Sequence, residues 1–127
     1  MELNVETAEE LWKTIDIKGF THYEISSHGR VRSKARIYRY EDGSEKKFAR
    51  YIRRLFICGR GFVCVGLFDG DTNRTNTYRV HQLVATHFLT KPSDSHRIVF
   101  HLDGDRTNNN VSNLLYVRAV RGSRYYV

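Results

Sequence analysis

The stretch IVFHLDGDRTNNNVSNLLYV, residues 98–117, constrains the fold of this chain more than any other part of the sequence. Three apolar residues lead into His101, and four asparagines follow within six positions, at 108, 109, 110 and 113. Asparagine is a poor helix and strand former, but its side chain bonds neighbouring backbone groups in turns. The stretch therefore predicts an apolar strand that ends at His101, a hydrogen-bonded loop, and a second strand.

Length and composition bound the class of protein. The 127 residues suffice for one domain or for two small modules that share a core. With 40% apolar residues, 28% charged residues and one proline, the composition argues against disorder. No apolar run is long enough to span a bilayer, and the acidic start MELNVETAEELW lacks the layout of a signal peptide. We therefore expect an intracellular protein that does not enter a membrane.

Two cysteines, Cys58 and Cys64, lie six positions apart. A bridge between them is possible only across a turn, and no further cysteines supply a disulfide framework or a zinc site. We expect two buried free thiols on a strand.

The net charge of +7 is unevenly spread along the chain. Residues 1–11 hold four acidic residues and no basic one, whereas residues 30–60 hold eleven Lys or Arg and three acidic residues. A sustained positive field attracts a polyanion, and nucleic acid is the commonest one. A basic surface without such a partner has the same composition, so charge alone leaves both interpretations open.

Local patterns predict mostly short strands. Residues 5–14 favour a short helix, and residues 23–37 favour two strands around a turn at Gly29. In the second strand, four basic residues recur at spacing two and so share one face: Arg30, Arg32, Lys34 and Arg36. Such a face suits contact with a phosphate backbone, although a solvated outer face has the same pattern.

The remaining patterns predict a turn within residues 38–49, a second hairpin over residues 50–80 and one amphipathic helix over residues 81–90. His81 and His87 fall on different faces of that helix, so they cannot share a metal, and we assign both to packing or capping. The predicted core residues are Trp12, Phe20, Tyr23, Ile25, Val63, Val65, Leu67, Leu83, Val84, Phe88, Val99 and Leu114.

Two motifs, in matching order and spacing, resemble those of one protein family. WKTIDIKGFTHYEISSHGRVRSK resembles a small module that accompanies certain nucleases, and VHQLVATHF followed by VFHLDGDRTNNNVSNLLYV resembles the nuclease core itself. Over roughly residues 12–117 the chain is thus similar to the HNH homing endonucleases of phages and mobile introns. The resemblance implies an α+β fold of short antiparallel β-hairpins with one central helix, of the ββα-metal type. It also implies a nuclease-associated, DNA-binding module at 1–40 and an HNH-like domain at 41–127, which we expect to form one compact unit.

The resemblance also assigns roles to individual residues. It implies that His101 is the general base that activates water for attack on a phosphodiester, with Asn113 fixing the loop and Asn109 helping. It further implies one divalent cation, Mg²⁺ or Mn²⁺, that polarises the phosphoryl group. Asp103 and Asp105 lie in the same loop, and both turn formation and metal ligation are open to them.

Two departures from the family pattern concern the metal. The residue before the histidine is commonly Asp, Asn or His and binds the metal in catalytic members. Here it is Phe100, whose ring has no lone pair for a hard cation. The second ligand normally lies on a helix after the Asn-Leu-x-aromatic strand, where this chain has RAVRGSRYYV. We therefore expect a truncated or missing final helix and a weakened or lost metal site.

Three hypotheses for function follow, and whether the chain is an enzyme stays open. The first is a DNA-binding protein of phage or mobile-element origin, acting in the bacterial cytoplasm if it is phage-encoded. The second is an active metal-dependent endonuclease or nickase, and the third is a phage-type protein that binds and inhibits a host protein. For the first, the residues predicted to contact double-stranded DNA are Arg30, Arg32, Lys34, Arg36, Arg50, Arg53, Arg54, Arg60, Arg106, Arg118, Arg121 and Arg124.

Overall fold

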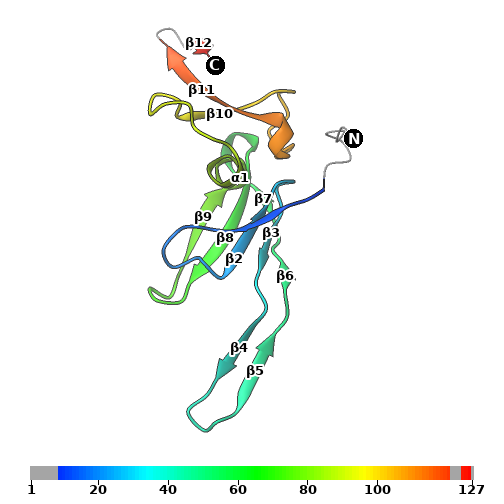
Figure 1. Cartoon of the computed structure of the whole chain (residues 1–127), viewed down its shortest axis with the longest axis vertical. Helices are drawn as coiled ribbons and strands as arrows, with labels where there is room; N and C mark the ends of the chain where they lie inside the picture. Colours follow the sequence, from blue (N-terminus) through cyan, green and yellow to red (C-terminus); the bar gives the residue numbers. More distant parts are fainter. Residues whose placement is uncertain (1–8, 121–123, 127) are drawn as a thin grey trace.

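The computed structural model describes residues 9–120 and 124–126, which form short antiparallel sheets around a single α-helix, α1 (Val80–Phe88), as Figure 1 shows. One sheet has the order β1-β2-β3-β6, built from Trp12–Thr14, Tyr23–Ser26, Val31–Ser33 and Tyr51–Ile52. A second sheet, β7-β8-β9, contains Phe56–Ile57, Val63–Asp69 and Arg74–Arg79. The third, β10-β11-β12, contains Ile98–His101, Leu114–Val120 and Arg124–Tyr126. These elements confirm the predicted α+β class with one central helix.

The core lies where α1 packs against strands of all three of these sheets. Val65, Leu67, Val80 and Val84 have no exposed surface, and burying a side chain of this size stabilises the fold by roughly 1.5–3 kcal/mol. Ten of the twelve predicted core residues are buried. The other two are Phe88, which packs against the edge of the cluster, and Trp12, which is half-buried.

Helix α1 has nearly the predicted bounds. It ends where Leu89 N donates to Ala85 O, three residues before Pro92. His87 Nδ1 bonds Leu83 O at 2.7 Å, and its Nε2 accepts from Asp16 N at 2.9 Å, which confirms the predicted packing role. No helix among the described residues is long and apolar enough to cross a membrane.

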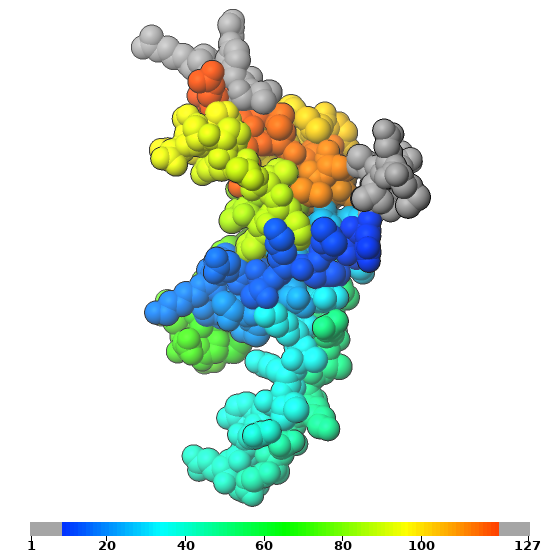
Figure 2. Space-filling view, viewed as in Figure 1, coloured from blue at the N-terminus to red at the C-terminus, as the bar shows by residue number. Residues whose placement is uncertain are grey.

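A separate hairpin projects from the body of the molecule (Figures 1 and 2) and consists of β4 (Arg36–Arg39) and β5 (Glu45–Phe48). The predicted turn closes it. Asp42 Oδ1 accepts from the backbone and hydroxyl of Ser44, and Gly43 adopts a φ of 88°. All eight strand residues are exposed. The turn was predicted, but its two flanking strands were not.

The predicted N-terminal helix is wrong for the residues that the structure describes. Residues 9–11 are not helical, and Trp12–Thr14 form strand β1, with Trp12 opposite Ser26 on β2. Residues 5–8 of that prediction lie outside the described residues. The extended conformation is favoured because Leu11 N donates to Ser27 Oγ and Ser27 N donates to Leu11 O. Non-local pairing thus overrides the local helix propensity.

Two strand predictions also need correction. The basic run from Arg30 to Arg36 is not one strand, because β3 ends at Ser33 and Lys34 N donates to His22 O before β4 begins. Residues 50–80 are not one hairpin either. Tyr51–Ile52 pairs with β3, and only the part from Phe56 onward forms the β7-β8-β9 sheet.

The prediction of two free thiols is wrong, because Cys58 and Cys64 form a disulfide. Strands β7 and β8 pair Ile57 with Val63, and Cys58 N donates to Phe62 O just beyond that pair. The short 3-10 turn η2 (Gly59–Gly61) therefore brings the two Cα atoms to 6.1 Å, a separation that a disulfide spans.

Candidate functional site

His101 ends strand β10 and is 6% exposed. Its Nε2 lies 2.8 Å from Asn109 Oδ1. A carbonyl oxygen can only accept, so the proton of the neutral ring is on Nε2 and the lone pair is on Nδ1. Among the described residues, none forms a hydrogen bond with Nδ1. In this arrangement Nδ1 of His101 keeps a lone pair that can accept a proton.

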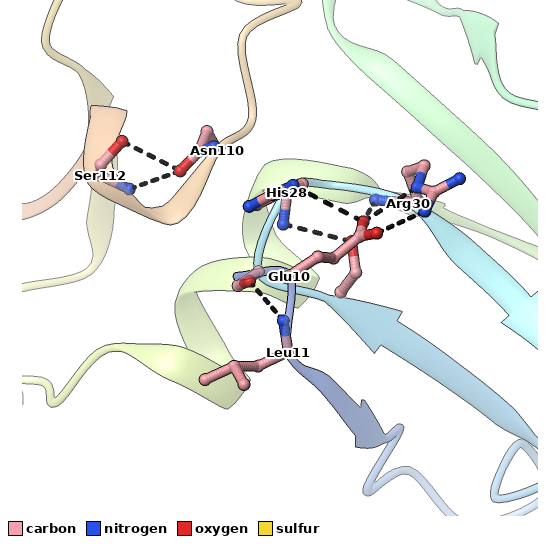
Figure 3. A network of polar contacts seen from close by, with 8 residues as sticks. Glu10, Leu11, His28, Arg30, Asn110 and Ser112 are labelled. Carbon is pink, nitrogen blue, oxygen red and sulfur yellow. Dashed lines mark hydrogen bonds and ion pairs between the residues drawn. The ribbon is translucent and has the colours of Figure 1, made fainter. Parts of the chain in front are cut away.

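The asparagines hold the loop that surrounds His101. Asn113 Nδ2 donates to Asp103 Oδ1 and to Asn108 O, both at 2.9 Å, while its Oδ1 accepts from Asp103 N at 3.1 Å. Asn110 Oδ1 accepts from the backbone N and hydroxyl of Ser112 at 3.1 and 2.9 Å (Figure 3) and so starts the 3-10 turn η3 (Val111–Asn113). The loop is therefore fixed by side-chain amides rather than by apolar packing.

Asp103 and Asp105 are engaged inside this loop. Asp103 Oδ1 accepts from Asp105 N at 2.8 Å, and its Oδ2 accepts from Asn108 Nδ2 at 2.9 Å. Asp105 Oδ1 accepts from the backbone N and hydroxyl of Thr107. These bonds, chiefly from Asn108 for Asp103 and from Thr107 for Asp105, lower the pKa of both carboxyl groups. Both aspartates act as turn formers in this structure.

The donors beside His101 do not fit a Mg²⁺ or Mn²⁺ ion. Such ions take several oxygen ligands, at about 2.1 Å for Mg²⁺. Phe100, the neighbour of His101, is 42% exposed and has no oxygen to offer. Asp103 already uses both carboxylate oxygens in the loop. Across residues 9–120, no three His, Cys, Asp or Glu side chains are grouped to share an ion.

A cationic cluster surrounds Phe62, which follows the turn η2. The ring of Phe62 stacks on His81 at a centroid distance of 4.8 Å. The guanidinium carbons of Arg79 and Arg106 lie 4.7 and 4.6 Å from the centroid of the same Phe62 ring. The ring of His81 lies 5.1 Å from that of His101, which links the cluster to the loop. We call Phe62, Arg79, His81 and Arg106 the Phe62 cluster.

His81 is the buried member of this cluster, with 2% of its surface exposed. Burial, together with the charges of His101, Arg79 and Arg106, lowers the pKa of His81 to about 4. Its Nε2 lies 3.3 Å from the amide nitrogen of Gln82, which can only donate. The ring proton is therefore on Nδ1, a buried atom without a hydrogen-bond partner among the described residues.

A cavity of about 280 Å³ opens beside the Phe62 cluster and the His101 loop. Phe62, Phe100, His101, Gly104 and Arg106 are among the residues that line it. The cavity thus combines an arginine with apolar walls, and it lies where the sequence resemblance places the chemistry.

Two of the arginines predicted to bind DNA are ion-paired. Arg30 and Arg32 lie 5.4 and 3.8 Å from the ring of Trp12. Arg30 bonds both carboxylate oxygens of Glu10, as Figure 3 shows, and Arg32 Nε donates to Glu24 at 3.1 Å. The bond from Arg30 lowers the pKa of Glu10 to about 2. We call these five residues the Trp12 cluster.

Four other predicted residues meet in one groove of about 420 Å³, which we call the basic groove: Lys34, Arg36, Arg50 and Arg53. The rings of Phe48 and Tyr51 also line it. Burial, followed by the charge of Arg36, lowers the pKa of His22 in the same groove. The groove lies at the base of the β4–β5 hairpin, because Arg36 and Phe48 are paired residues of that hairpin.

The remaining predicted residues are scattered. Arg54 and Arg118 are exposed, and the carbonyl of the exposed Arg60 accepts from Arg106 Nη1. Arg124 lies in β12, and Arg121 lies outside the described residues.

Sequence reasoning missed the Phe62 cluster. Arg79 and Phe62 were not among the predicted site residues, and His81 was assigned to packing or capping. The available signal was the sequence Arg79-Val80-His81, a cation and an imidazole at the start of a helix with no acidic residue in its first turn. A helix N-terminus of this kind favours anions.

Comparison with known proteins identifies two parts of the chain. The NUMOD4 motif matches residues 10–68, and the HNH endonuclease family matches residues 78–119. Two uncharacterized HNH endonucleases of Acanthamoeba polyphaga mimivirus are 41% identical over 75% of this chain and 35% identical over 81% of it. The DNA endonuclease I-HmuI of Bacillus phage SP01 is 35% identical over 84% of this chain. The chain spans 20%, 26% and 51% of the lengths of these three relatives.

A solved structure gives the same relationship. The structure titled "DNA binding and cleavage by the HNH homing endonuclease I-HmuI" matches with a TM-score of 0.62 and 30% identity. The match covers 85% of this chain and 52% of that chain. Fold, motif order and relatives therefore agree: the chain carries a NUMOD4 motif ahead of an HNH endonuclease domain, and its relatives are HNH endonucleases that include the phage homing endonuclease I-HmuI.

Proposed function

We propose that this chain binds double-stranded DNA through backbone phosphates, on an HNH scaffold whose metal site is weakened or lost. The observation that carries the proposal is a well-held His101 beside Phe100, a residue that cannot bind a cation. In phosphodiester hydrolysis the cation supplies much of the stabilisation of developing charge. A positioned histidine without that cation favours binding over cleavage.

The basic groove and the hairpin beside it support DNA binding. The groove gathers four cations around one hollow. The β4–β5 hairpin projects from the body of the molecule (Figure 2), and Lys46 and Lys47 on β5 are exposed. Cations that neutralise phosphates release counterions, so affinity for DNA falls steeply as salt rises. The relative I-HmuI, whose solved structure is described as binding and cleaving DNA, supports the same class of partner.

An active endonuclease or nickase is the second candidate, and one observation favours it. Asn109 holds His101 in the tautomer that leaves Nδ1 ready to accept a proton. For this candidate, Asp103 or Asp105 has to leave its loop hydrogen bonds and bind the cation instead. The His101→Ala variant then loses all cleavage that Mg²⁺ or Mn²⁺ produces.

Supercoiled plasmid separates these candidates in one gel. The wild-type chain and His101→Ala are incubated with plasmid at low salt in Mn²⁺, in Mg²⁺ or in EDTA, before and after removal of protein. We expect retarded plasmid in every lane run before the protein is removed, with retardation lost as salt rises. We expect intact plasmid in every lane run after the protein is removed. Nicking that needs the cation and disappears in His101→Ala contradicts the proposal and supports the endonuclease. Plasmid that is neither cut nor retarded contradicts both and leaves a host protein as the partner to test.

A further inference from the structure

We propose that one face of the β4–β5 hairpin binds the unpaired bases of a single-stranded nucleic acid by stacking. We call it the ring face, and it consists of three aromatic rings and two cations: Tyr38, Tyr40, Phe48, Arg36 and Lys46. The inference goes beyond the proposed function, because it names a second form of nucleic acid and a contact with bases rather than with the phosphates of a duplex.

The register of the hairpin places these residues on one side. Paired residues of antiparallel strands lie on the same face, and successive residues of one strand alternate between faces. Arg36 pairs with Phe48, and two positions further along Tyr38 pairs with Lys46, so these four side chains share a face. Tyr40 follows β4 and joins them, because its ring lies 4.8 Å from the ring of Tyr38. Each of the first two rows therefore holds one ring and one cation.

The ring face is open to solvent. The β4–β5 pair forms a two-stranded sheet of its own and projects from the body of the molecule, as Figures 1 and 2 show. Tyr38 and Tyr40 are 56% and 47% exposed, and Phe48 is 37% exposed. A two-stranded hairpin has no core of its own in which to bury such rings. A group of exposed aromatic side chains on one surface is typical of a binding site.

The charge on the ring face suits an anionic partner. The guanidinium carbon of Arg36 and Nζ of Lys46 lie 5.0 and 5.1 Å from the centroid of the Phe48 ring. The acidic Glu45 lies on the opposite face, where its Oε1 is 3.0 Å from Nε of Arg39. Arg36 and Phe48 also line the basic groove, which continues the positive surface. Rings interleaved with cations match a strand in which bases and phosphates alternate.

The chemistry of the ring face favours unpaired bases over a duplex. In a duplex the faces of the bases cover one another, and a protein reaches the base edges through the grooves. Aromatic rings stack instead on the open faces of unpaired bases, whatever the sequence. Neither strand of the hairpin contains Asn or Gln, the side chains that pair with adenine edges. The rings of Tyr38 and Tyr40 are inclined at 70°, so a base that stacks on one ring meets the edge of the other.

Parallel titrations with a single strand and a duplex test the site. A fluorescent 20-nucleotide oligothymidine and a labelled 20-base-pair duplex are titrated in EDTA with the full chain. The variants are Tyr38→Ala, Tyr40→Ala, the double variant, and Tyr38→Phe, which keeps the ring. Ile37→Ala is the matched control, because Ile37 is 53% exposed and lies on the opposite face of the same strand. Both Ile37→Ala and Tyr38→Ala lower the strand propensity of β4, so the control measures any effect of a weaker hairpin.

Stacking predicts which affinities fall. Loss of one exposed base–aromatic stack weakens single-strand binding about 5- to 10-fold. We expect this loss in Tyr38→Ala and in Tyr40→Ala, a larger loss in the double variant, and wild-type affinity in Tyr38→Phe and Ile37→Ala. We expect the duplex affinity of all these variants to stay at the wild-type level. Tyr38→Ala is expected to keep the slope of log affinity against log salt for the single strand, whereas Lys46→Gln lowers that slope by about 0.7.

Three results overturn the inference. The first is a wild-type chain that binds the duplex but not the oligothymidine, in which case the proposed function stands. The second is a double tyrosine variant that loses affinity for the duplex and the single strand equally, or loses no more than Ile37→Ala does. The third is a wild-type chain that binds neither nucleic acid, which overturns the proposed function as well. A wild-type chain that binds only the single strand, through the tyrosines, supports the ring face while the proposed function fails.

An oligouridine of the same length distinguishes RNA from DNA as the source of the unpaired bases. Stacking does not depend on the sugar, so we expect Tyr38→Ala and Tyr40→Ala to weaken the binding of both strands. If the affinity for only one of the two strands depends on these rings, the ring face is a site for that nucleic acid. If neither affinity depends on them, the inference is overturned.

Discussion

The Trp12 cluster and the Phe62 cluster each place two arginine guanidiniums against one aromatic ring, within 3.8–5.4 Å of its centroid. In the Trp12 cluster, Glu10 and Glu24 neutralise both arginines. In the Phe62 cluster, no acidic side chain among residues 9–120 pairs with either arginine. Cation–π contacts are therefore common to both clusters, and only the charge balance distinguishes them.

This difference in charge balance gives the two clusters different roles: the Trp12 cluster stabilises the fold, and the Phe62 cluster is expected to bind an anion. A neutralised pair of arginines ties strands β1, β2 and β3 together, because its partners lie in or beside those strands. An unneutralised pair adds positive potential at a cavity and so attracts an anion. Substitutions in the Trp12 cluster are therefore expected to lower the free energy of unfolding, and substitutions in the Phe62 cluster to lower DNA affinity.

The largest effect is expected at Gly29, where the turn beside the Trp12 cluster meets the loop beside the Phe62 cluster. Gly29 has a φ of 86°, and an added Cβ meets Asn109 Cβ at 2.9 Å and Asn109 O at 3.1 Å. We expect Gly29→Ala to lower the free energy of unfolding by at least about 2 kcal/mol, from strain and from the displaced loop. Gly43→Ala is the control, since its φ is 88° but no atom lies within 4 Å of the new Cβ. Equal losses in urea denaturation contradict the contact.

Glu24 gives the next largest effect. Its partner Arg32 is only 18% exposed at the side chain, so Glu24→Gln leaves a mostly buried guanidinium without its charged acceptor. We expect a loss of about 1.5 kcal/mol in the free energy of unfolding and no loss of DNA affinity. Glu45→Gln is the control, because the Arg39–Glu45 pair is 76% and 41% exposed and such pairs contribute about 0.5 kcal/mol or less. Weaker DNA binding by Glu24→Gln contradicts the division between the clusters.

Arg106→Gln is expected to have the opposite effects to Glu24→Gln, with stability kept and DNA affinity lowered. Its side chain is exposed, and we expect the free energy of unfolding to change by less than about 0.5 kcal/mol. We expect the affinity of this variant for DNA to fall, because the variant loses a positive charge that attracts phosphate. Parallel urea and DNA titrations of Arg106→Gln and Glu24→Gln measure both the free energy of unfolding and the DNA affinity of each variant. A variant that loses both stability and DNA affinity argues against the difference between the two clusters.

Acid titration distinguishes the clusters by the pH range in which each loses stability, because the pKa values of Glu10 and His81 are both lowered but from different ordinary values. Glu10 has a folded-state pKa of about 2, below its ordinary value of 4.5, because Arg30 holds the carboxylate charged. This ion pair therefore stabilises the fold above pH 4.5, and that stabilisation is lost as the pH falls toward 2. Glu10→Gln is expected to remove this part of the acid dependence in denaturation measured between pH 5 and 2. An unchanged profile in the variant shows that other groups carry it.

The smallest effect is expected at His81. Burial and the neighbouring cations lower its pKa from 6.5 to about 4. The unfolded chain takes up this proton below pH 6.5 and the folded chain does not, so stability falls as the pH drops from 6.5 toward 4. NMR titration of the His81 ring measures the pKa directly. A value near 6.5 contradicts the charged, buried cluster.

The sequence predicted the parts of this fold that depend on neighbouring residues. Helix α1, the β2–β3 turn and the asparagine-rich loop follow from local periodicity and turn chemistry. The β1 strand did not, because its pairing with β2 depends on contacts between residues about a dozen positions apart. The disulfide was missed because the geometry of the η2 turn is not visible in a six-residue spacing.

The residues of the candidate site also fall into two groups, those close together in the sequence and those brought together by the fold. His101, Asn109 and Asn113 follow one another within a single loop, so their proximity was visible in the sequence. The Phe62 cluster joins residues from β9, α1 and two loops, and the meeting of these elements depends on the packing of the whole domain. The ion pair that neutralises Arg30 was hidden for the same reason, since its partner Glu10 was assigned to a helix.

We propose that the metal site of this HNH scaffold is weakened or lost, and Mn²⁺ binding to the isolated chain tests this proposal most directly. Electron paramagnetic resonance measures the free Mn²⁺ signal as the wild-type chain, Asp103→Asn and Asp105→Asn are added. We expect all three proteins to leave the free Mn²⁺ signal unchanged at micromolar Mn²⁺, because Phe100 offers no ligand and Asp103 is engaged in the loop. A stoichiometric loss of the free Mn²⁺ signal with the wild-type chain, which either aspartate substitution prevents, contradicts the proposed loss of the metal site. That result supports the active endonuclease instead.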